Sequence, residues 1–256
     1  MKKLLALLLA LCMVMAFAAC QPADDNPTDD PNKDVVDIHA KSEGVMTHAE
    51  YIAAEVGAEV TVECFVQSTQ SWWNDTITIY AQDKDGGYFL YNMACSEDLS
   101  KQLVPGTKIR AKGEKAVWSG EVEIMEGTIE ILEGSYTAEA VDVTAELGTD
   151  ALESKQNMLA AFKGMTVVAK TNEAGEEVPF FYKWNDAGAE GDDIYFDVEV
   201  GGNTYTFTIE SYLTADGSDA YEAAQNLKVG DKIDMTGYLY WYEGVQPHII
   251  SITPAA

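Results

Sequence analysis

Positive charge is what this sequence of 256 residues lacks most, with 16 Lys and Arg against 43 Asp and Glu and a formal net charge of −27. Binding to a phosphate backbone depends on clustered Lys and Arg, so this balance disfavours nucleic acid as a partner, and anionic lipid headgroups for the same reason. Arg110 is the one arginine, and the 3 His are scattered. Phosphotransfer and His-ligated metal chemistry are therefore disfavoured.

Catalytic motifs are missing as well. The sequence has no Gly-x-Ser-x-Gly elbow, no His-Glu-x-x-His, no phosphate loop and no dinucleotide fingerprint. Acids at Asp83 and Asp85 and in residues 186–193 offer oxygens of the kind that Ca²⁺ takes, but without EF-hand spacing. A β-turn is the commoner explanation for the first group, and a polar insert is the commoner explanation for the second. We expect a protein that is not an enzyme and that has no metal and no cofactor.

Apolar runs long enough to span a membrane are absent, and residues 4–17 form the one strong apolar run. Lys2 and Lys3 precede it, as in a secretory signal. The run ends in Phe17-Ala18-Ala19-Cys20, which resembles the bacterial lipobox, where small residues precede an acylated Cys. The resemblance implies a signal peptide over 1–19 and a lipid on Cys20 that anchors the protein to the extracytoplasmic face of the cell membrane, its only membrane contact. Cleavage after Ala18 with release of a soluble protein is the alternative.

The segment after Cys20 has a composition that does not fold. Residues 21–37 carry three Pro and six Asp and almost no apolar side chain before Val35. Such a segment cannot bury enough surface to become ordered, and its like charges keep it extended. We expect residues 20–43 to be a tether.

An internal repeat divides the remainder into two domains. Gly-x-Lys-Ile-x-x-x-Gly occurs at residues 106–113 and again at 230–237, and each copy is followed by a Trp and then a Gly. A weaker match lies upstream, Ala53-Ala54-Glu55-Val56-Gly57 against Ala160-Ala161-Phe162-Lys163-Gly164, each followed by a Val-rich run. Two matches in the same order indicate duplication. The predicted domains are residues 44–134 and 135–256.

Alternating apolar positions predict the strands of both copies. The first copy has a capping box at Thr47 that starts a short helix, and a second short helix capped by Ser96. Its expected strands are 60–66, 76–82, 88–93, 108–115 and 121–132. The second copy has expected strands 165–170, 194–200, 204–210, 232–237 and 245–252, a helix at 219–227 and an insert at 171–193. The predicted fold is mainly β, with two small five-stranded barrels, each with a short helix between strands 3 and 4.

This strand order resembles the OB-fold, and the chain looks like the tandem OB-fold lipoproteins of Gram-positive anaerobes over residues 44–253. The best-matching residues run from Ser71-Trp72-Trp73 through Trp118 to Ile124. The resemblance implies ligand binding on strands two and three and in the flanking loops. The favoured function is non-catalytic binding of an oligosaccharide or an envelope protein. Extracellular binding of single-stranded nucleic acid, or a nuclease-accessory role, is the alternative, and a structural spacer without ligand is the third.

Aromatic side chains are the first candidates for a binding surface. Trp72 and Trp73 fall in the loop between strands one and two, while Tyr80 and Tyr88 fall on strands two and three. Exposed rings would stack on sugars or bases. The alternative is that they fill the barrel, as we expect of Trp118 and Trp241.

A basic cluster is the second candidate. Lys108, Arg110 and Lys112 alternate along one strand and so share one face. They form either an anion site or a set of cross-strand partners for neighbouring acids.

Two cysteines, Cys64 and Cys95, remain beyond the lipid candidate. In an exported protein they could form a disulfide. The other interpretation is two buried thiols.

Overall fold

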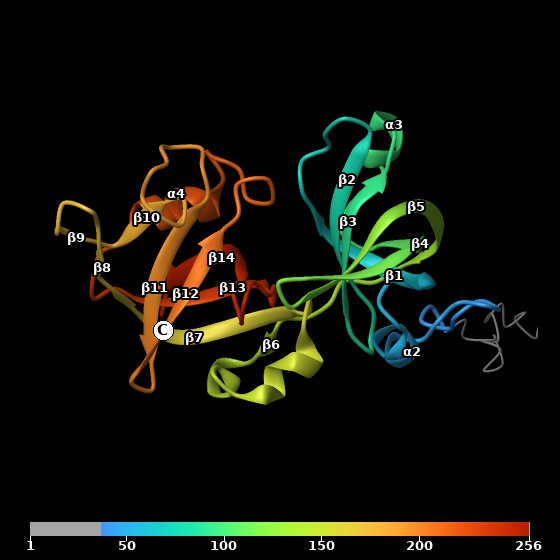
Figure 1. The fold of residues 1–256 in the computed structure, drawn as a ribbon, viewed down its shortest axis with the longest axis horizontal. Coiled ribbons are helices and arrows are strands. Elements are labelled where there is room, and N and C mark those ends of the chain that lie inside the picture. Colours follow the sequence, from blue (N-terminus) through green and yellow to red (C-terminus); the bar gives the residue numbers. More distant parts are fainter. Residues whose placement is uncertain (1–36, 256) are drawn as a thin grey trace, which may run out of the picture. The chain divides into compact units, whose positions relative to one another are not determined.

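A computed structural model describes residues 37–255 of the chain (Figure 1). The lipobox, Cys20 and most of the predicted tether lie outside these residues. Residues 38–256 form one compact unit of two β-barrels. Among the described residues, no helix has the length and apolarity needed to cross a membrane.

The first barrel is a closed sheet with strand order β1-β2-β3-β5-β4. Helix α2 precedes it, and helix α3 lies between β3 and β4. The elements are α2 (His48–Ala53), β1 (Glu59–Thr69), β2 (Thr76–Gln82), β3 (Gly87–Ala94), α3 (Glu97–Ser100), β4 (Thr107–Trp118) and β5 (Glu121–Ser135).

Local sequence explains the two helices of this barrel. The Thr47 side chain accepts from the Glu50 backbone N–H, and the Glu50 carboxylate accepts from the Thr47 backbone N–H, which is the predicted capping box. The Ser96 side chain caps α3 in the same way. Helix α3 therefore bridges strands 3 and 4, as predicted.

Alternation sets which side chains of the first barrel face inward. Val60, Val62, Cys64 and Val66 of β1 all lie in the core, and so do Ile77, Ile79 and Ala81 of β2 and Ile109 and Ala111 of β4. Each of these was predicted from the period-two pattern.

The second barrel repeats the topology. Its five strands pair in a ring, β7-β11-β12-β14-β13 and back to β7, and α4 lies between β12 and β13, the third and fourth of these strands along the chain. The elements are β6 (Val141–Asp142), η1 (Thr144–Glu146), η2 (Asp150–Lys155), β7 (Leu159–Val168), β8 (Lys170–Thr171), β9 (Glu177–Val178), β10 (Phe180–Tyr182), β11 (Ile194–Val200), β12 (Asn203–Ile209), α4 (Asp219–Gln225), β13 (Lys232–Tyr238) and β14 (His248–Pro254). Two OB-like barrels, the predicted fold class, are thus confirmed.

Strand β7 differs from its prediction by starting at Leu159 rather than at residue 165. The pairing of β13 with β7 shifts register so that Lys163 and Gly164 bulge out of the ladder. Gly164 has φ +62°, which glycine adopts without strain. Gly164, which directly precedes the predicted strand, is therefore part of a bulge inside a longer strand. The insert at 171–193 contains the β8–β9 hairpin and the added edge strand β10.

Candidate functional site

The outer face of strands β2 and β3 is covered by the second barrel. Tyr80 and Phe89, which pair across these strands, form a buried cluster with Tyr238, against which Leu159, Leu213, Tyr240 and Ile250 pack. We call this cluster the inter-barrel seam. The Tyr80 and Tyr238 rings stack with centroids 4.6 Å apart. The face on which an OB-fold ligand was expected is therefore an internal joint.

Hydrogen bonds give the seam a fixed geometry. The Tyr80 hydroxyl lies 2.6 Å from His248 Nδ1, and the Tyr238 hydroxyl lies 2.6 Å from Ser68 Oγ. The His248 ring stacks on Tyr240 at 4.1 Å. Burial lowers the pKa of His248 to about 3, so this ring is neutral at physiological pH.

Tyr80 and Tyr88 are consequently not exposed stacking platforms, and the prediction of exposed rings at these two positions is wrong. Both have 0% exposure. Tyr80 is covered by the other barrel, whereas Tyr88 lies in the first barrel's own core and donates a hydrogen bond to Asp83. Neither kind of covering can be seen in the local alternation of the strands.

The two tryptophans of the β1–β2 loop have different environments. Trp72 packs against the first core, and its Nε1–H donates to the Cys95 carbonyl at 2.8 Å, so it closes one end of the barrel. Trp73 is 78% exposed. It sits at the start of a tight turn to Thr76 in which Asn74 and Asp75 have positive φ, a conformation that these residue types tolerate.

A groove of about 290 Å³ lies beside this loop, where the two barrels meet. Its lining from the first barrel consists of residues 69–72, Ile77 and Ser100. Its lining from the second barrel consists of Tyr212, Leu213 and Ala215. No charged side chain is among these lining residues, which carry hydroxyls, one amide and several apolar surfaces. We call it the junction groove.

Tyr212 is the second exposed ring at this place, with 68% exposure. The Ser71 N–H donates to the Tyr212 carbonyl at 2.9 Å, which ties the two loops together. Sequence reasoning missed Tyr212, because the first copy offers no aromatic at the corresponding end of its third strand and the groove exists only once both barrels are in place.

Glu210 holds the two walls of the junction groove in register. One carboxylate oxygen accepts from Gln70 Nε2 at 3.0 Å and from the Leu213 N–H at 2.8 Å, and the other accepts from the Tyr212 N–H at 3.2 Å. Burial, with a smaller contribution from Asp193, raises the pKa of Glu210 to about 7. Glu210 was not predicted either, since one acid among 43 carries no signal.

The predicted basic cluster is paired with acids. Arg110 binds Glu63 at 2.8 Å and Glu130 at 2.7 Å, Lys108 approaches Glu63 at 3.7 Å, and Lys112 binds Glu59 at 2.9 Å. Lys112 also lines a second groove, of about 430 Å³, together with Glu59, Glu114 and Glu126. This arrangement matches the alternative in which Lys108, Arg110 and Lys112 are partners of neighbouring acids.

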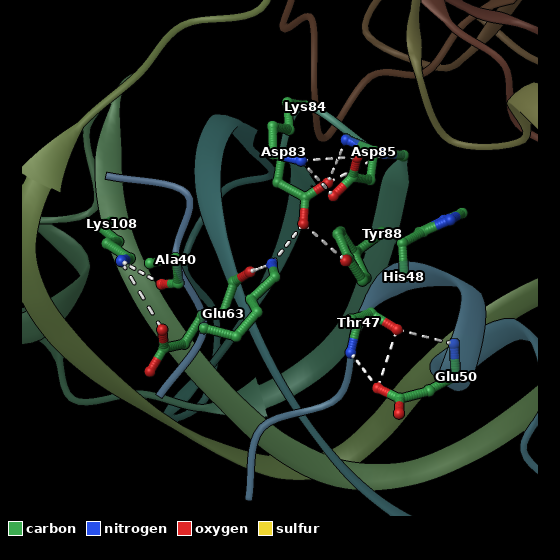
Figure 2. Close-up of polar contacts among 12 residues, drawn as sticks. Ala40, Thr47, His48, Glu50, Glu63, Asp83, Lys84, Asp85, Tyr88 and Lys108 are labelled. Atoms are coloured by element: carbon green, nitrogen blue, oxygen red, sulfur yellow. Dashed lines mark hydrogen bonds and ion pairs between the residues drawn. The ribbon is translucent and has the colours of Figure 1, made fainter. Parts of the chain in front are cut away.

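Residues 38–46 lie across the first barrel and contact Glu63, Lys108 and Arg110 of the same charged cluster. We call these residues the strap. Lys41 forms an ion pair with buried Asp83 and donates to the Glu63 carbonyl, and the Met46 N–H donates to the Thr61 carbonyl. Figure 2 shows the Lys108 ammonium group reaching the Ala40 carbonyl and Glu63. Burial alone would raise the pKa of Asp83, but the Lys41 ion pair and the hydrogen bonds from the Asp85 backbone and Tyr88 hold it below its usual value.

Asp83 has no oxygen left for a metal. One carboxylate oxygen accepts from the backbone of Asp85 and Gly86, and the other accepts from Lys41 and Tyr88. Within residues 37–255, no group of three or more His, Cys, Asp or Glu is placed to hold a metal ion.

The disulfide alternative for Cys64 and Cys95 is wrong, because both are free buried thiols. Burial raises the pKa of each thiol, which keeps both protonated. Trp118, expected in the core, is 59% exposed at the β4–β5 turn, whereas Trp241 does pack against the second core.

Comparison with known proteins gives no family model that matches the chain and no curated protein that matches it. Solved structures do match. The tetrameric p202 HIN2 structure has 10% identity and a TM-score of 0.34 and aligns over 79% of this chain and 96% of its own. The Ifi202 HINa domain in complex with 20bp dsDNA has 12% identity and a TM-score of 0.34, over 78% and 100%. A Replication Protein A heterotrimer bound to ssDNA has 13% identity and a TM-score of 0.30, over 77% and 49%.

These matches correct the prediction that disfavoured nucleic acid as a partner. The chains that this protein is similar to include structures bound to dsDNA and to ssDNA. The net charge of a whole chain does not exclude this ligand, because binding depends on the charges at the site. TM-scores this low carry no argument about which ligand this chain binds.

Proposed function

We propose that this chain is a non-catalytic binding protein whose ligand lies in the junction groove and stacks on Trp73 and Tyr212. The observation that carries the proposal is a pre-formed groove that is lined by Trp72 of the first barrel and by the exposed Tyr212 of the second, with the exposed Trp73 next to Trp72 in the same loop. Rings that need no rearrangement bind at low entropic cost.

The favoured ligand is an oligosaccharide. The groove lining supplies the Gln70 amide and the hydroxyls of Thr69, Ser71 and Ser100, which suit sugar hydroxyls, while the rings suit the apolar faces of pyranose units. An uncharged lining fits a neutral ligand.

Single-stranded nucleic acid is the second candidate. Bases stack on the same rings, and Lys101 follows the lining residue Ser100 with 62% of its side chain exposed. Its ion pairs with Glu97 and Asp98 are exposed, so they hold it weakly and leave it able to contact a phosphate.

The test is a thermal-shift series with neutral and acidic oligosaccharides and with single-stranded oligonucleotides at two salt concentrations. A ligand present at about 100 times its Kd adds about 2.7 kcal/mol to the free energy of unfolding. Trp73→Ala and Tyr212→Ala should abolish the shift, while Trp184→Ala, which removes an exposed ring of the 171–193 insert, should preserve it.

The salt series separates the two ligands. A shift that persists at high salt supports the oligosaccharide, and a shift that high salt removes and that Lys101→Ala weakens supports nucleic acid. Shifts that none of these substitutions affects would overturn the groove as the binding site.

The cellular location is proposed separately. We infer from the lipobox-like Phe17-Ala18-Ala19-Cys20 that Cys20 is acylated and holds the protein on the extracytoplasmic face of a membrane. In a bacterial host, the intact protein should partition into detergent, and Cys20→Ser should shift it to the aqueous phase. Equal partitioning of both forms would overturn the anchor.

A further inference from the structure

Glu121 lies where the β4–β5 turn of the first barrel meets the second barrel. Five hydrogen bonds tie this turn to the other barrel. Gln156 Nε2 donates to the Gly120 carbonyl at 2.8 Å, Asn157 Nδ2 donates to the Val122 carbonyl at 3.1 Å, and the Trp241 N–H donates to Glu121 Oε2 at 2.9 Å. The Val122 N–H donates to Gln156 Oε1 at 3.2 Å, and the Glu243 N–H donates to the Ser119 carbonyl at 2.7 Å. We call this contact the hairpin junction. It is distinct from the aromatic seam and does not include the groove.

Two buried oxygens in the hairpin junction have no partner, Glu121 Oε1 and Asn157 Oδ1. The Asn157 side chain lies within hydrogen-bonding reach of the Glu121 carboxyl. Both oxygens are acceptors when Glu121 is ionised, so neither can satisfy the other. The Asn157 Nδ2 group donates to the Val122 carbonyl and makes no hydrogen bond to Glu121 Oε1, and rotating the amide would break the bond to Val122.

A proton on Glu121 satisfies both atoms at once. We propose that Glu121 is protonated in the folded protein at neutral pH, and that its Oε1–H donates to Asn157 Oδ1 as a proton-dependent lock between the two barrels. The acid then donates to one group of the second barrel and accepts from another, Trp241. An unpaired buried oxygen is costly, so the same arrangement without the proton is much less stable.

The surroundings of Glu121 favour the neutral form. The ionisable groups that face it are Glu123 on its own strand, Tyr51 from α2, Tyr80 from β2 and Tyr240 from the second barrel. Among the described residues, no Lys, Arg or His forms an ion pair with it. Burial, with a smaller contribution from Glu123, raises the pKa of Glu121 to about 8, and the hydrogen bond from the Trp241 N–H acts against this rise.

The proton on Glu121 makes the stability of the folded state depend on pH. The unfolded chain releases this proton near the ordinary pKa of glutamate, about 4.3, whereas the folded chain keeps it to about pH 8. The folded state therefore holds one more proton between these two values. The stabilisation is complete below the lower value and is lost progressively as the pH rises to the upper one.

The experiment compares the intact protein with Glu121→Gln by urea unfolding from about pH 5 to about pH 9. A glutamine keeps the acceptor for Trp241 and offers a permanent N–H donor to Asn157. The folding equilibrium constant of the variant, divided by that of the intact protein, should rise about tenfold per pH unit up to about pH 8 and then level off. Glu133→Gln, an exposed acid on the same strand, is the matched control and should give a flat ratio.

A flat ratio for Glu121→Gln would overturn the lock, because an acid that is ionised in both states takes up no proton on folding. Infrared spectroscopy provides a second measurement that needs no unfolding. Glu210, with its pKa of about 7, contributes a carbonyl band of a protonated carboxylic acid at neutral pH in both proteins, so the measurement is the difference spectrum. The intact protein minus Glu121→Gln should show one additional band of this kind, and a difference spectrum without it would equally contradict the proposal.

Discussion

The two barrels have the same strand order but use the outer face of their second and third strands differently. In the first barrel this face carries Tyr80 opposite Phe89, and the second barrel covers both. In the second barrel the matching face carries Asp197 opposite Thr206 and Glu199 opposite Thr204, and Glu199 and Thr204 are exposed. One copy of a duplicated fold thus serves as a joint, while the other keeps a solvated surface.

The difference shows what duplication can change without changing topology. A pair of aromatic residues in place of a carboxylate and a threonine turns a surface into an interface, since each large ring buries much apolar area. The joint in turn creates the junction groove, which neither barrel could form alone.

The largest expected effect comes from truncating matched tyrosines on the two faces. Tyr80→Ala removes a ring with 0% exposure and should lower the free energy of unfolding by about 3–5 kcal/mol. Tyr195→Ala, at the partly exposed outer face of β11, should cost about 1 kcal/mol. Urea unfolding measures both, and equal costs would remove the distinction between covered and open faces.

The second-largest effect should be a loss of stability at acidic pH, caused by His248 at the covered face. Burial lowers the pKa of His248 in the folded protein to about 3. Below about pH 6.5 the unfolded chain therefore binds a proton on this ring, whereas the folded chain does not. Stability should fall as the pH drops from 6.5, by about 2 kcal/mol near pH 5. Unfolding of His248→Gln should lack this contribution, and an unchanged pH profile in the variant would show that the ring is not kept neutral.

The neighbouring tryptophans sharpen the comparison within the first barrel. Trp72→Ala removes a partly buried ring and its hydrogen bond to Cys95, so it should cost about 1–2 kcal/mol. Trp73→Ala removes an exposed ring and should change stability by less than about 0.5 kcal/mol. Thermal unfolding without ligand measures both changes in stability. A large loss of stability for Trp73→Ala would mean that this ring has a structural rather than a binding role.

Ion pairs on the two barrels should give the smallest difference. Lys170 and Asp197 of the second barrel are 12% and 20% exposed, and Lys170 also lies over the Phe181 ring. Its truncation to Ala should cost about 1 kcal/mol. Lys112 and Glu59 of the first barrel are 52% and 73% exposed, so Lys112→Ala should cost less than about 0.5 kcal/mol. Urea unfolding at low and at high salt measures both costs. A larger loss of stability for Lys112→Ala than for Lys170→Ala would contradict this expectation.

Local sequence was enough for the architecture. Period-two alternation placed Val60, Val62 and Ile109 in the core, and capping residues placed the short helices, because these features depend on neighbours in the chain. The repeat then extended the same topology to the second half. The first residues of strand β7 were not predicted, because a glycine in a β-bulge and a glycine before a strand look alike in a single sequence.

The site depends on contacts that no local pattern encodes. Tyr80 alternates outward as predicted, yet it is buried because a domain that begins more than 50 residues later packs on it. Trp118 and Trp241 occupy matched repeat positions, yet one is exposed and the other packed, since the two turns have different neighbours. The junction groove, Tyr212 and Glu210 arise from the same docking and could not be read from either copy.

The strap has a mechanical consequence. Tension that enters the described chain at its N-terminal end reaches the strap before any strand of the barrel. Its load is shared by the Lys41 ion pair with Asp83, the Arg110 contact with Ser42 and the Met46 hydrogen bond to Thr61. These bonds join the strap to β1, β4 and the β2–β3 turn, so a pull at one point is spread over three places in the sheet before a strand can peel away.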